Sequence, residues 1–342
     1  MKEAYLTQME NPENVLEIEN LQTCFFTDRG VVRSVDGVSF SVPAGSTVAV
    51  VGESGCGKSV TSLSVMQLLQ KPQGRVTAGS IRLNLGGTAV DIPKTPERVM
   101  QKLRGGQLSM VFQEPMTALN PVLTVGRQVR EAVRLHHPQG KDRRFCQKRA
   151  EALLSQVGIP DSAAVSRKYP HQLSGGMRQR VCIAMALAAD PRLIIADEPT
   201  TALDVTIQAQ ILALLQNLKE KTGCALLLIT HDLGVVAQMA DFVVVMYAGR
   251  VVEQGTVQDI FYRPAHPYTR ALLAAKPVVG IPVERLFAIG GTVPDPVNLP
   301  KHCYFRERCG HGEECCEEYP VQISLSATHK VSCWRQEAKD GT

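Results

Sequence analysis

The sequence contains no long hydrophobic run. Its longest uninterrupted apolar stretch, residues 181–189, has nine residues, whereas a helix that crosses a bilayer needs about 20. Residues 1–20 are polar and acidic and lack the hydrophobic segment of a secretory signal. We therefore expect a protein of the cytoplasm, which reaches a membrane only through a partner.

The sequence also lacks a strong charge of either sign. Its net charge is +4, from 37 basic and 33 acidic residues, and it has no long run of lysine and arginine. A protein dedicated to nucleic acid usually carries a basic stripe. There are no internal repeats or low-complexity segments. The composition therefore argues against nucleic acid as a partner.

Short apolar runs alternate with helical patterns over most of the 342 residues, of which 44% are hydrophobic. The apolar runs predict strands buried on both faces, at residues 47–51, 193–196, 225–229 and 242–246. Helical patterns cover residues 58–70, 126–152, 176–189 and 207–218, and alternating patterns at 15–18, 37–42 and 79–91 predict further strands. This order predicts an α/β fold whose mostly parallel sheet binds ligands at the carboxyl ends of its strands.

From about residue 259 the prolines accumulate and the periodicity fades. We therefore predict two parts, a main domain over residues 1–258 and a C-terminal extension over residues 259–342. The extension holds five of the ten cysteines, Cys303, Cys309, Cys315, Cys316 and Cys333. In a reducing cytoplasm such a group indicates a metal or an iron–sulfur centre rather than disulfides.

A glycine-rich segment follows the apolar run 47–51 and precedes a helical pattern. It reads Gly52, Glu53, Ser54, Gly55, Cys56, Gly57, Lys58 and Ser59, followed by Val60, and it fits G-x-x-x-x-G-K-[ST] at every fixed position. Such a loop wraps a phosphate with its backbone amides at a helix N-terminus. Lys58 is expected to reach the terminal phosphates and Ser59 to coordinate Mg²⁺. The alternative is a glycine-rich turn without a ligand.

Two carboxylates follow the apolar run 193–196. Asp197 is the candidate Mg²⁺ ligand, and Glu198 is placed to act as general base on the attacking water. His231 follows the run 225–229 and is a candidate partner of the terminal phosphate. The alternatives are a helix-capping acidic pair and a structural histidine.

The segment Leu173-Ser174-Gly175-Gly176-Met177 opens a helical pattern. A serine-capped helix start explains the serine. The combination with an upstream phosphate loop and a downstream Asp-Glu resembles the ATP-binding-cassette ATPases. That resemblance implies an α/β fold with a RecA-like P-loop NTPase core, an antiparallel β subdomain, an α-helical signature subdomain at about 115–180 and a small Cys-rich C-terminal extension.

The resemblance also implies roles for residues outside the loop. Gln113 resembles the glutamine that senses Mg²⁺ and contacts the permease, and Asp204 resembles the residue that communicates across the ATPase dimer. His231 resembles the switch histidine. Phe25, with Phe26 as a rival, lies where the family has an aromatic that stacks on adenine. In relatives, the signature residues Ser174, Gly175 and Gly176 of one chain close over the nucleotide held by the other.

Residues 52–60, 112–121 and 263–273 resemble the ATPases of dipeptide, oligopeptide and nickel importers. Val60 favours the first of the two paralogous ATPases of such systems. The resemblance implies ATP and Mg²⁺ as cofactors. The implied partners are a second ATPase subunit, two permeases and an extracytoplasmic solute-binding protein at the cytoplasmic face of the cell membrane. A soluble cassette ATPase acting on nucleic acid or the ribosome is the distant alternative.

In many members of this branch four cysteines match Cys303, Cys309, Cys316 and Cys333. Several relatives carry a 4Fe–4S cluster there, and zinc and free thiols are the alternatives. Cys315 is an adjacent substitute for Cys316. The expected role is structural, because a tail of this size buries too little apolar surface to fold unaided.

Overall fold

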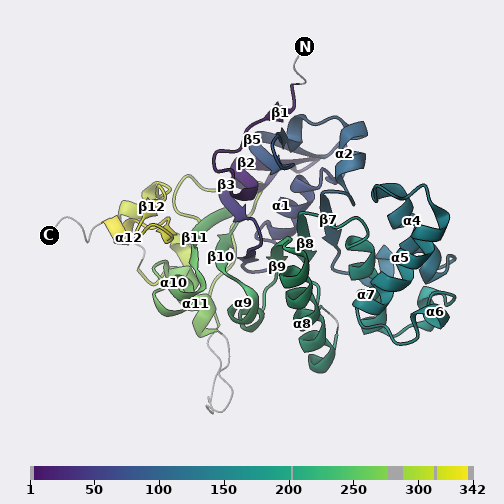
Figure 1. The fold of residues 1–342 in the computed structure, drawn as a ribbon. Coiled ribbons are helices and arrows are strands. Elements are labelled where there is room, and N and C mark those ends of the chain that lie inside the picture. Colours follow the sequence, from purple (N-terminus) through teal and green to yellow (C-terminus); the bar gives the residue numbers. More distant parts are fainter. Residues whose placement is uncertain (1–3, 202, 276–287, 312–313, 338–342) are drawn as a thin grey trace. The chain divides into compact units, whose positions relative to one another are not determined.

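The computed structural model describes residues 4–201, 203–275, 288–311 and 314–337 (Figure 1). Its chain forms two compact units. The first comprises residues 1–16, 42–46 and 82–228, and the second comprises residues 17–41, 47–81 and 229–342. These units do not test the boundary near residue 258 between the main domain and the extension, which stays a prediction.

The first unit contains two small groups of strands and most of the helices. Strand β1 (Leu6–Thr7) pairs antiparallel with β6 (Ala89–Asp91), and β6 pairs with the end of β5 (Gly74–Asn84). Strand β7 (Leu108–Val111) runs parallel to β8 (Leu193–Asp197), and β9 (Ala225–Ile229) ends the unit. Its helices are α2 (Glu97–Leu103), α3 (Pro115–Ala118), α4 (Val125–His136), α5 (Arg143–Gln156), α6 (Ser162–Val165), α7 (Gly175–Ala186) and α8 (Val205–Thr222).

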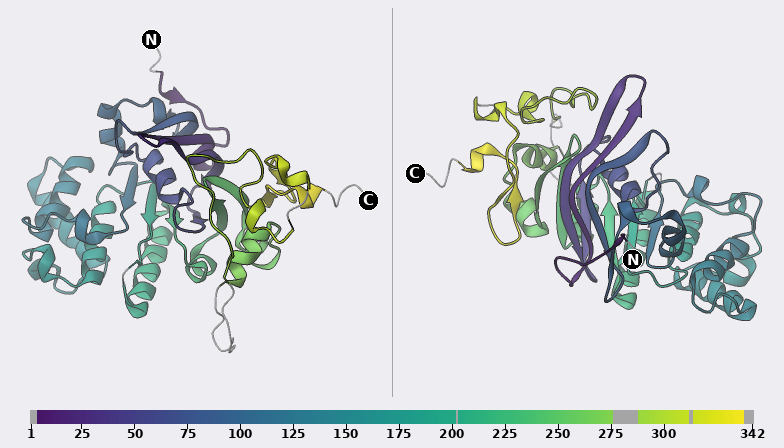
Figure 2. Two further views of the ribbon diagram at one scale, coloured as in Figure 1. Left: turned by 180° about the vertical axis from the view of Figure 1, so that it is seen from behind. Right: turned by 90° about the horizontal axis from the view of Figure 1, so that it is seen from above.

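Helices α3 to α7 form a helical group, seen in teal in both views of Figure 2. Helix α4 packs against α5 and α7, and α3 also packs against α7. The spacing of Val125, Val129 and Val133 explains the packing of α4, because residues four apart share one helix face. All three side chains are fully buried. The helical pattern expected at 126–152 is therefore two helices, separated by a segment that contains Pro138 and Gly140.

The second unit contains most of the two longest strands of the protein, together with the C-terminal residues. Its complete strands are β4 (Thr47–Val51), β10 (Phe242–Tyr247), β11 (Arg250–Thr256), β12 (Ile323–Ser324) and β13 (Lys330–Val331). It also contains most of β2 (Asn14–Thr27) and β3 (Gly30–Pro43), of which residues 14–16 and 42–43 belong to the first unit. Its helices are α1 (Lys58–Val65), α9 (Leu233–Met239), α10 (Val257–Tyr262), α11 (Pro267–Ala274) and α12 (Trp334–Glu337). Strand β4 runs parallel to β10, and β10, β11, β13 and β12 continue antiparallel.

The four predicted buried strands are confirmed as β4, β8, β9 and β10. Every residue of β4, β8 and β9 is buried, as expected for strands covered on both faces. The helix predicted over 58–70 is too long, because α1 ends at Val65. Two residues later Gln67 has a left-handed backbone with φ +52°, which no helix continues through.

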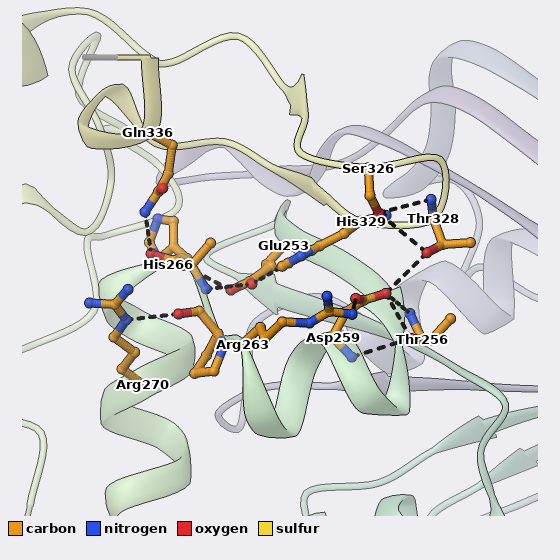
Figure 3. A network of polar contacts seen from close by, with 12 residues as sticks. Glu253, Thr256, Asp259, Arg263, His266, Arg270, Ser326, Thr328, His329 and Gln336 are labelled. Atoms are coloured by element: carbon orange, nitrogen blue, oxygen red, sulfur yellow. Dashed lines mark hydrogen bonds and ion pairs between the residues drawn. The ribbon is translucent and has the colours of Figure 1, made fainter. Parts of the chain in front are cut away.

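The C-terminal residues are anchored to β11 by a buried carboxylate (Figure 3). Glu253 is fully buried and accepts hydrogen bonds from the backbone amides of Ala265 and His266, at 2.7 and 2.9 Å. His329 Nε2 lies 2.7 Å from the same carboxylate. Burial lowers the pKa of His266 to about 4, although the charge of Glu253 opposes the shift. The neutral ring accepts the Tyr268 amide at 3.0 Å and caps α11.

An aromatic cluster packs beside this network. The ring of Tyr247 lies 4.7 Å from that of Tyr268 and 5.2 Å from that of Phe305, measured between centroids. These residues join Val51, Val243 and other buried side chains of β4 and β10 in one hydrophobic cluster. The extension is therefore packed on the core that carries the phosphate loop.

None of the helices described is both long enough and apolar enough for a membrane span.

Candidate functional site

The glycine-rich segment forms a tight loop between β4 and α1. Gly52, Gly55 and Gly57 have φ values of +154°, +78° and +99°, which side chains other than glycine rarely adopt. A Cβ on Gly52 would lie 2.2 Å from the carbonyl oxygen of Met246, and one on Gly57 would lie 2.3 Å from that of Ser34. A Cβ on Gly55 would meet no atom within 4 Å, and both Gly55 and Ser54 are exposed. Two glycines therefore fit the loop against neighbouring backbone, and the third opens it to solvent.

Lys58 is the first residue of α1, and its side chain lies within the loop. Only 5% of the residue is exposed. Its Nζ donates to the carbonyl oxygens of Gly52 and Glu53, at 2.8 and 2.9 Å, and lies 3.7 Å from the sulfur of Cys56. Burial raises the pKa of Cys56, so this thiol stays neutral. Ser59 and Val60 follow as half-buried residues of the helix. The loop thus presents a cation and a helix start together, an arrangement suited to a phosphate.

His231 stands near the end of β4. The amide of the preceding residue, Thr230, donates to the carbonyl oxygen of Val50 at 3.2 Å. Val50 is two residues before Gly52, so this bond brings the start of the segment after β9 to the end of β4. His231 is exposed there. The position of its imidazole beside the phosphate loop stays a prediction.

The carboxylates belong to the first unit. Asp197 ends β8 and is 5% exposed. Glu198 has a left-handed backbone, with φ +45°. Its Oε2 accepts hydrogen bonds from Gln113 Nε2 at 3.1 Å and from Thr201 Oγ1 at 2.9 Å. Residues held in this strained region of the backbone often belong to functional sites.

Parallel register explains why Gln113 meets Glu198. Val111 of β7 is opposite Ala196 of β8, and each polar residue lies two positions beyond its strand partner. Gln113 is exposed. Sequence analysis assigned these residues to separate roles and missed Thr201 altogether. Their contact follows only from strand pairing.

The signature segment begins α7, and Asp204 begins α8. Ser174 is the N-cap of α7 and accepts the Met177 amide at 3.4 Å, and Asp204 caps α8 by accepting the Ile207 amide at 2.9 Å. A Cβ on Gly176 would lie 2.6 Å from Cγ2 of Ile207, so this glycine permits close packing of α7 on α8. Ser174, Gly175 and Asp204 are exposed. The capping interpretation of Ser174 is thus confirmed.

Both candidate adenine-stacking residues already have neighbours. Phe25 is half-buried, and its ring packs against Gly74, where a Cβ would lie 2.7 Å from the ring. Phe26 is 37% exposed, and the guanidinium carbon of Arg75 lies 4.0 Å from its ring centroid. The choice between them stays a prediction.

The cysteines of the extension lie close enough to influence one another. The Cys303 amide donates to the carbonyl oxygen of Cys316 at 3.1 Å. Burial, with smaller contributions from the thiols of Cys316, Cys333 and Cys309, raises the pKa of Cys303 to about 11. Within residues 4–201, 203–275, 288–311 and 314–337, however, no group of three or more possible ligands has metal-binding geometry. The side chain of Cys315 lies outside the described residues.

Two residues that sequence analysis did not single out contact the phosphate loop. The Tyr268 hydroxyl accepts the Glu53 amide at 2.9 Å, and Arg308 forms an ion pair with the Glu53 carboxylate at 2.9 Å. The segment 263–273, which contains Tyr268, had been noted only as a family mark. No sequence pattern indicated a role for Arg308, because it lies 255 residues from Glu53 in the chain and nothing in the local sequence predicts their contact.

Two models of known protein families match parts of this chain. A family model described as ABC transporter matches residues 35–201, and one described as oligopeptide/dipeptide transporter, C-terminal region, matches residues 252–316. The chain is 49% identical over 328 residues to the dipeptide transport ATP-binding protein DppD of Bacillus subtilis (strain 168), covering 96% of each chain. It is 49% identical over 329 residues to a putative peptide import ATP-binding protein of Brucella abortus (strain 2308), covering 94% of this chain and 97% of the relative.

A solved structure shows the same fold. It is the dimeric ATP-binding cassette in a post-hydrolysis state bound to ADP and phosphate. The likeness has a TM-score of 0.63 at 26% identity and covers 71% of this chain and 98% of the solved one.

Proposed function

Because the chain belongs to the ABC transporter family of ATPases, we propose that it is the ATP-hydrolysing subunit of a membrane importer of peptides. One observation supports peptides as the substrate class. The match at 49% identity spans 96% of the chain and so includes the C-terminal region described for oligopeptide and dipeptide transporters. Nickel or another small solute, imported by a transporter of the same branch, is the alternative.

In the proposed site, one set of residues binds the nucleotide and Mg²⁺, and another residue acts in the hydrolysis step. The amides of residues 52–59 and the ammonium of Lys58 hold the phosphates, and a phenylalanine, Phe25 or Phe26, covers the adenine. Bound Mg²⁺ supplies positive charge that offsets the charge developing on the phosphates. Ser59, Asp197 and Gln113 are its proposed ligands. His231 contacts the terminal phosphate.

Glu198 is the proposed general base. The hydrogen bonds from Gln113 and Thr201 both fall on Oε2, and they orient the carboxylate toward a water to be deprotonated. General bases need such orientation before the transition state forms. Gln113 thereby connects the segment expected to contact the permease with the group that activates water.

The proposed assembly places the exposed Ser174, Gly175 and Asp204 against a second, paralogous ATPase subunit. An exposed helix start with glycines is a second anion site, so it suits the nucleotide of the partner chain. Two permeases and an extracytoplasmic solute-binding protein complete the importer. The chain then lies at the cytoplasmic face of the membrane.

Uptake by a reconstituted importer tests this function. We expect liposomes that contain the chain, its partner ATPase and permeases, supplied with the binding protein, to accumulate labelled dipeptides or longer peptides when ATP is enclosed. The Glu198→Gln chain should accumulate none and serves as the control. Uptake of Ni²⁺ but not of peptide would favour the alternative, and ATP-dependent uptake of neither would contradict the proposal.

We also propose that Cys303, Cys309, Cys316 and Cys333 hold a 4Fe–4S cluster, with zinc as the alternative. Four thiols are the donor set of such a cluster, and a backbone hydrogen bond joins Cys303 to Cys316 within one part of the extension. The described residues contain no preformed metal-binding group, so the proposal rests on the chemistry of the thiols. Such a centre would stabilise a segment that has only short elements of its own.

Metal analysis after anaerobic purification checks this proposal. We expect about four iron and four sulfide per chain, and loss of both in a Cys303→Ser variant. Cys24 is a buried cysteine of β2, and Cys24→Ser is the matched control that should keep the metal. One zinc per chain without iron would support the alternative, and metal-free protein would contradict both.

A further inference from the structure

Glu53, the second residue of the phosphate loop, is held by two residues of the C-terminal extension. Arg308 donates from Nη1 to Oε2 at 2.9 Å and from Nη2 to Oε1 at 3.1 Å. The Glu53 amide donates to the hydroxyl of Tyr268, which is fully buried. The Glu53 carbonyl accepts from Lys58. The side chain and the amide of one loop residue thus depend on the extension, and its carbonyl contacts the phosphate-binding lysine.

Arg308 is itself firmly held. Its side chain is 5% exposed, and its Nε donates to the carbonyl oxygen of Gly290 at 2.9 Å. Further bonds reach the carbonyl oxygen of Ile289 at 3.3 Å and the hydroxyl of Tyr247 at 3.2 Å. A bidentate arginine–carboxylate pair has two directional bonds, so it sets the orientation of the carboxylate as well as its position.

We propose that Arg308 is a positioning residue for ATP binding, which acts on the phosphate loop through Glu53. The proposal rests on the proposed binding of ATP by this loop. The extension then does more than stabilise the chain, because it sets how well the loop accepts a nucleotide.

Charge and geometry both support this role. Without Arg308, the carboxylate of Glu53 would be an unpaired negative charge in a loop that binds a polyanion, and like charges at short range repel. Glu53 would also lose the bond that orients it, while its carbonyl is an acceptor of Lys58. Both changes weaken binding of ATP before any chemistry occurs.

The position of Arg308 in the chain connects it to the cysteines of the extension. Arg308 ends a short 3-10 turn, Arg306–Arg308, which lies between Cys303 and Cys309 in the chain. The Arg306 amide donates to the carbonyl oxygen of Cys303 at 3.0 Å, and the Cys309 amide donates to that of Arg306 at 3.1 Å. The fold of the cysteine segment therefore determines where the guanidinium points.

The test is the nucleotide affinity of an Arg308→Ala chain. We expect the Kd for MgATP, measured by calorimetry, to rise about ten-fold, as for loss of a partly buried charge pair. The KM for ATP should rise similarly, while kcat at saturating ATP stays within about a factor of two. A merely structural role would reduce the folded fraction and so lower kcat without changing KM. Unchanged Kd and KM would overturn the proposal.

Four further tests with other variants make the result specific. Arg308→Lys keeps the charge but loses the bidentate geometry, and it should give an intermediate Kd. In a Glu53→Gln background Arg308→Ala should have little further effect, and an undiminished effect would overturn a route through Glu53. Arg263→Ala removes another ion pair of the extension, with Asp259, and should leave Kd unchanged. Lys58→Ala should lose ATP, and normal binding there would overturn the proposed loop function instead.

Discussion

Replacing Glu198 by glutamine is expected to lower ATP turnover by about 10²–10⁴, the usual contribution of a general base. The amide is nearly isosteric with the carboxylate, and its oxygen still accepts from Gln113 and Thr201, which both bond Oε2. It takes up no proton at neutral pH. The local structure should therefore persist while the chemistry fails.

Binding and turnover must be measured separately for this prediction. The Kd for MgATP should stay within about a factor of two of the parent chain, whereas phosphate release falls. Glu131→Gln, at an exposed position of α4, is the matched control and should hydrolyse ATP normally. Near-normal turnover in the Glu198→Gln chain would remove Glu198 from the role of base.

Replacing Gly57 by alanine is expected to reduce the free energy of unfolding by about 3–5 kcal/mol, as a left-handed backbone and overpacking add together. The new Cβ would lie 2.3 Å from the carbonyl oxygen of Ser34, at a residue with φ +99°. That neighbour is backbone and has no rotamer by which to move away. Urea unfolding without nucleotide measures the loss.

Gly55→Ala is the matched control for this effect. Gly55 also has a left-handed backbone, at φ +78°, but its Cβ would meet no atom within 4 Å. We expect a loss of only about 1–2 kcal/mol there, from the backbone alone. Equal losses at the two positions would show that the contact with Ser34 is not what requires glycine at Gly57.

Much of the fold follows from local sequence patterns. The runs 47–51, 193–196, 225–229 and 242–246 are apolar at successive positions, and only a strand covered on both faces buries such a run. Helix ends were less predictable. Helix α1 ends at Val65, and Gln67 shortly after it has a left-handed backbone conformation. No residue pattern in the sequence predicts that conformation.

By itself, the sequence determined the phosphate loop, the acidic pair Asp197–Glu198 and the signature segment, because each is a short run whose chemistry depends on neighbouring residues. It also indicated the extension, through the accumulation of prolines and the loss of periodicity after about residue 259. Only the tertiary structure decided how these parts are held. Strand register brings Gln113 to Glu198, and the packed extension brings Arg308 to Glu53 across 255 residues of chain. The reason is physical: such contacts arise from the packing of distant segments, and local residue preferences contain no information about them.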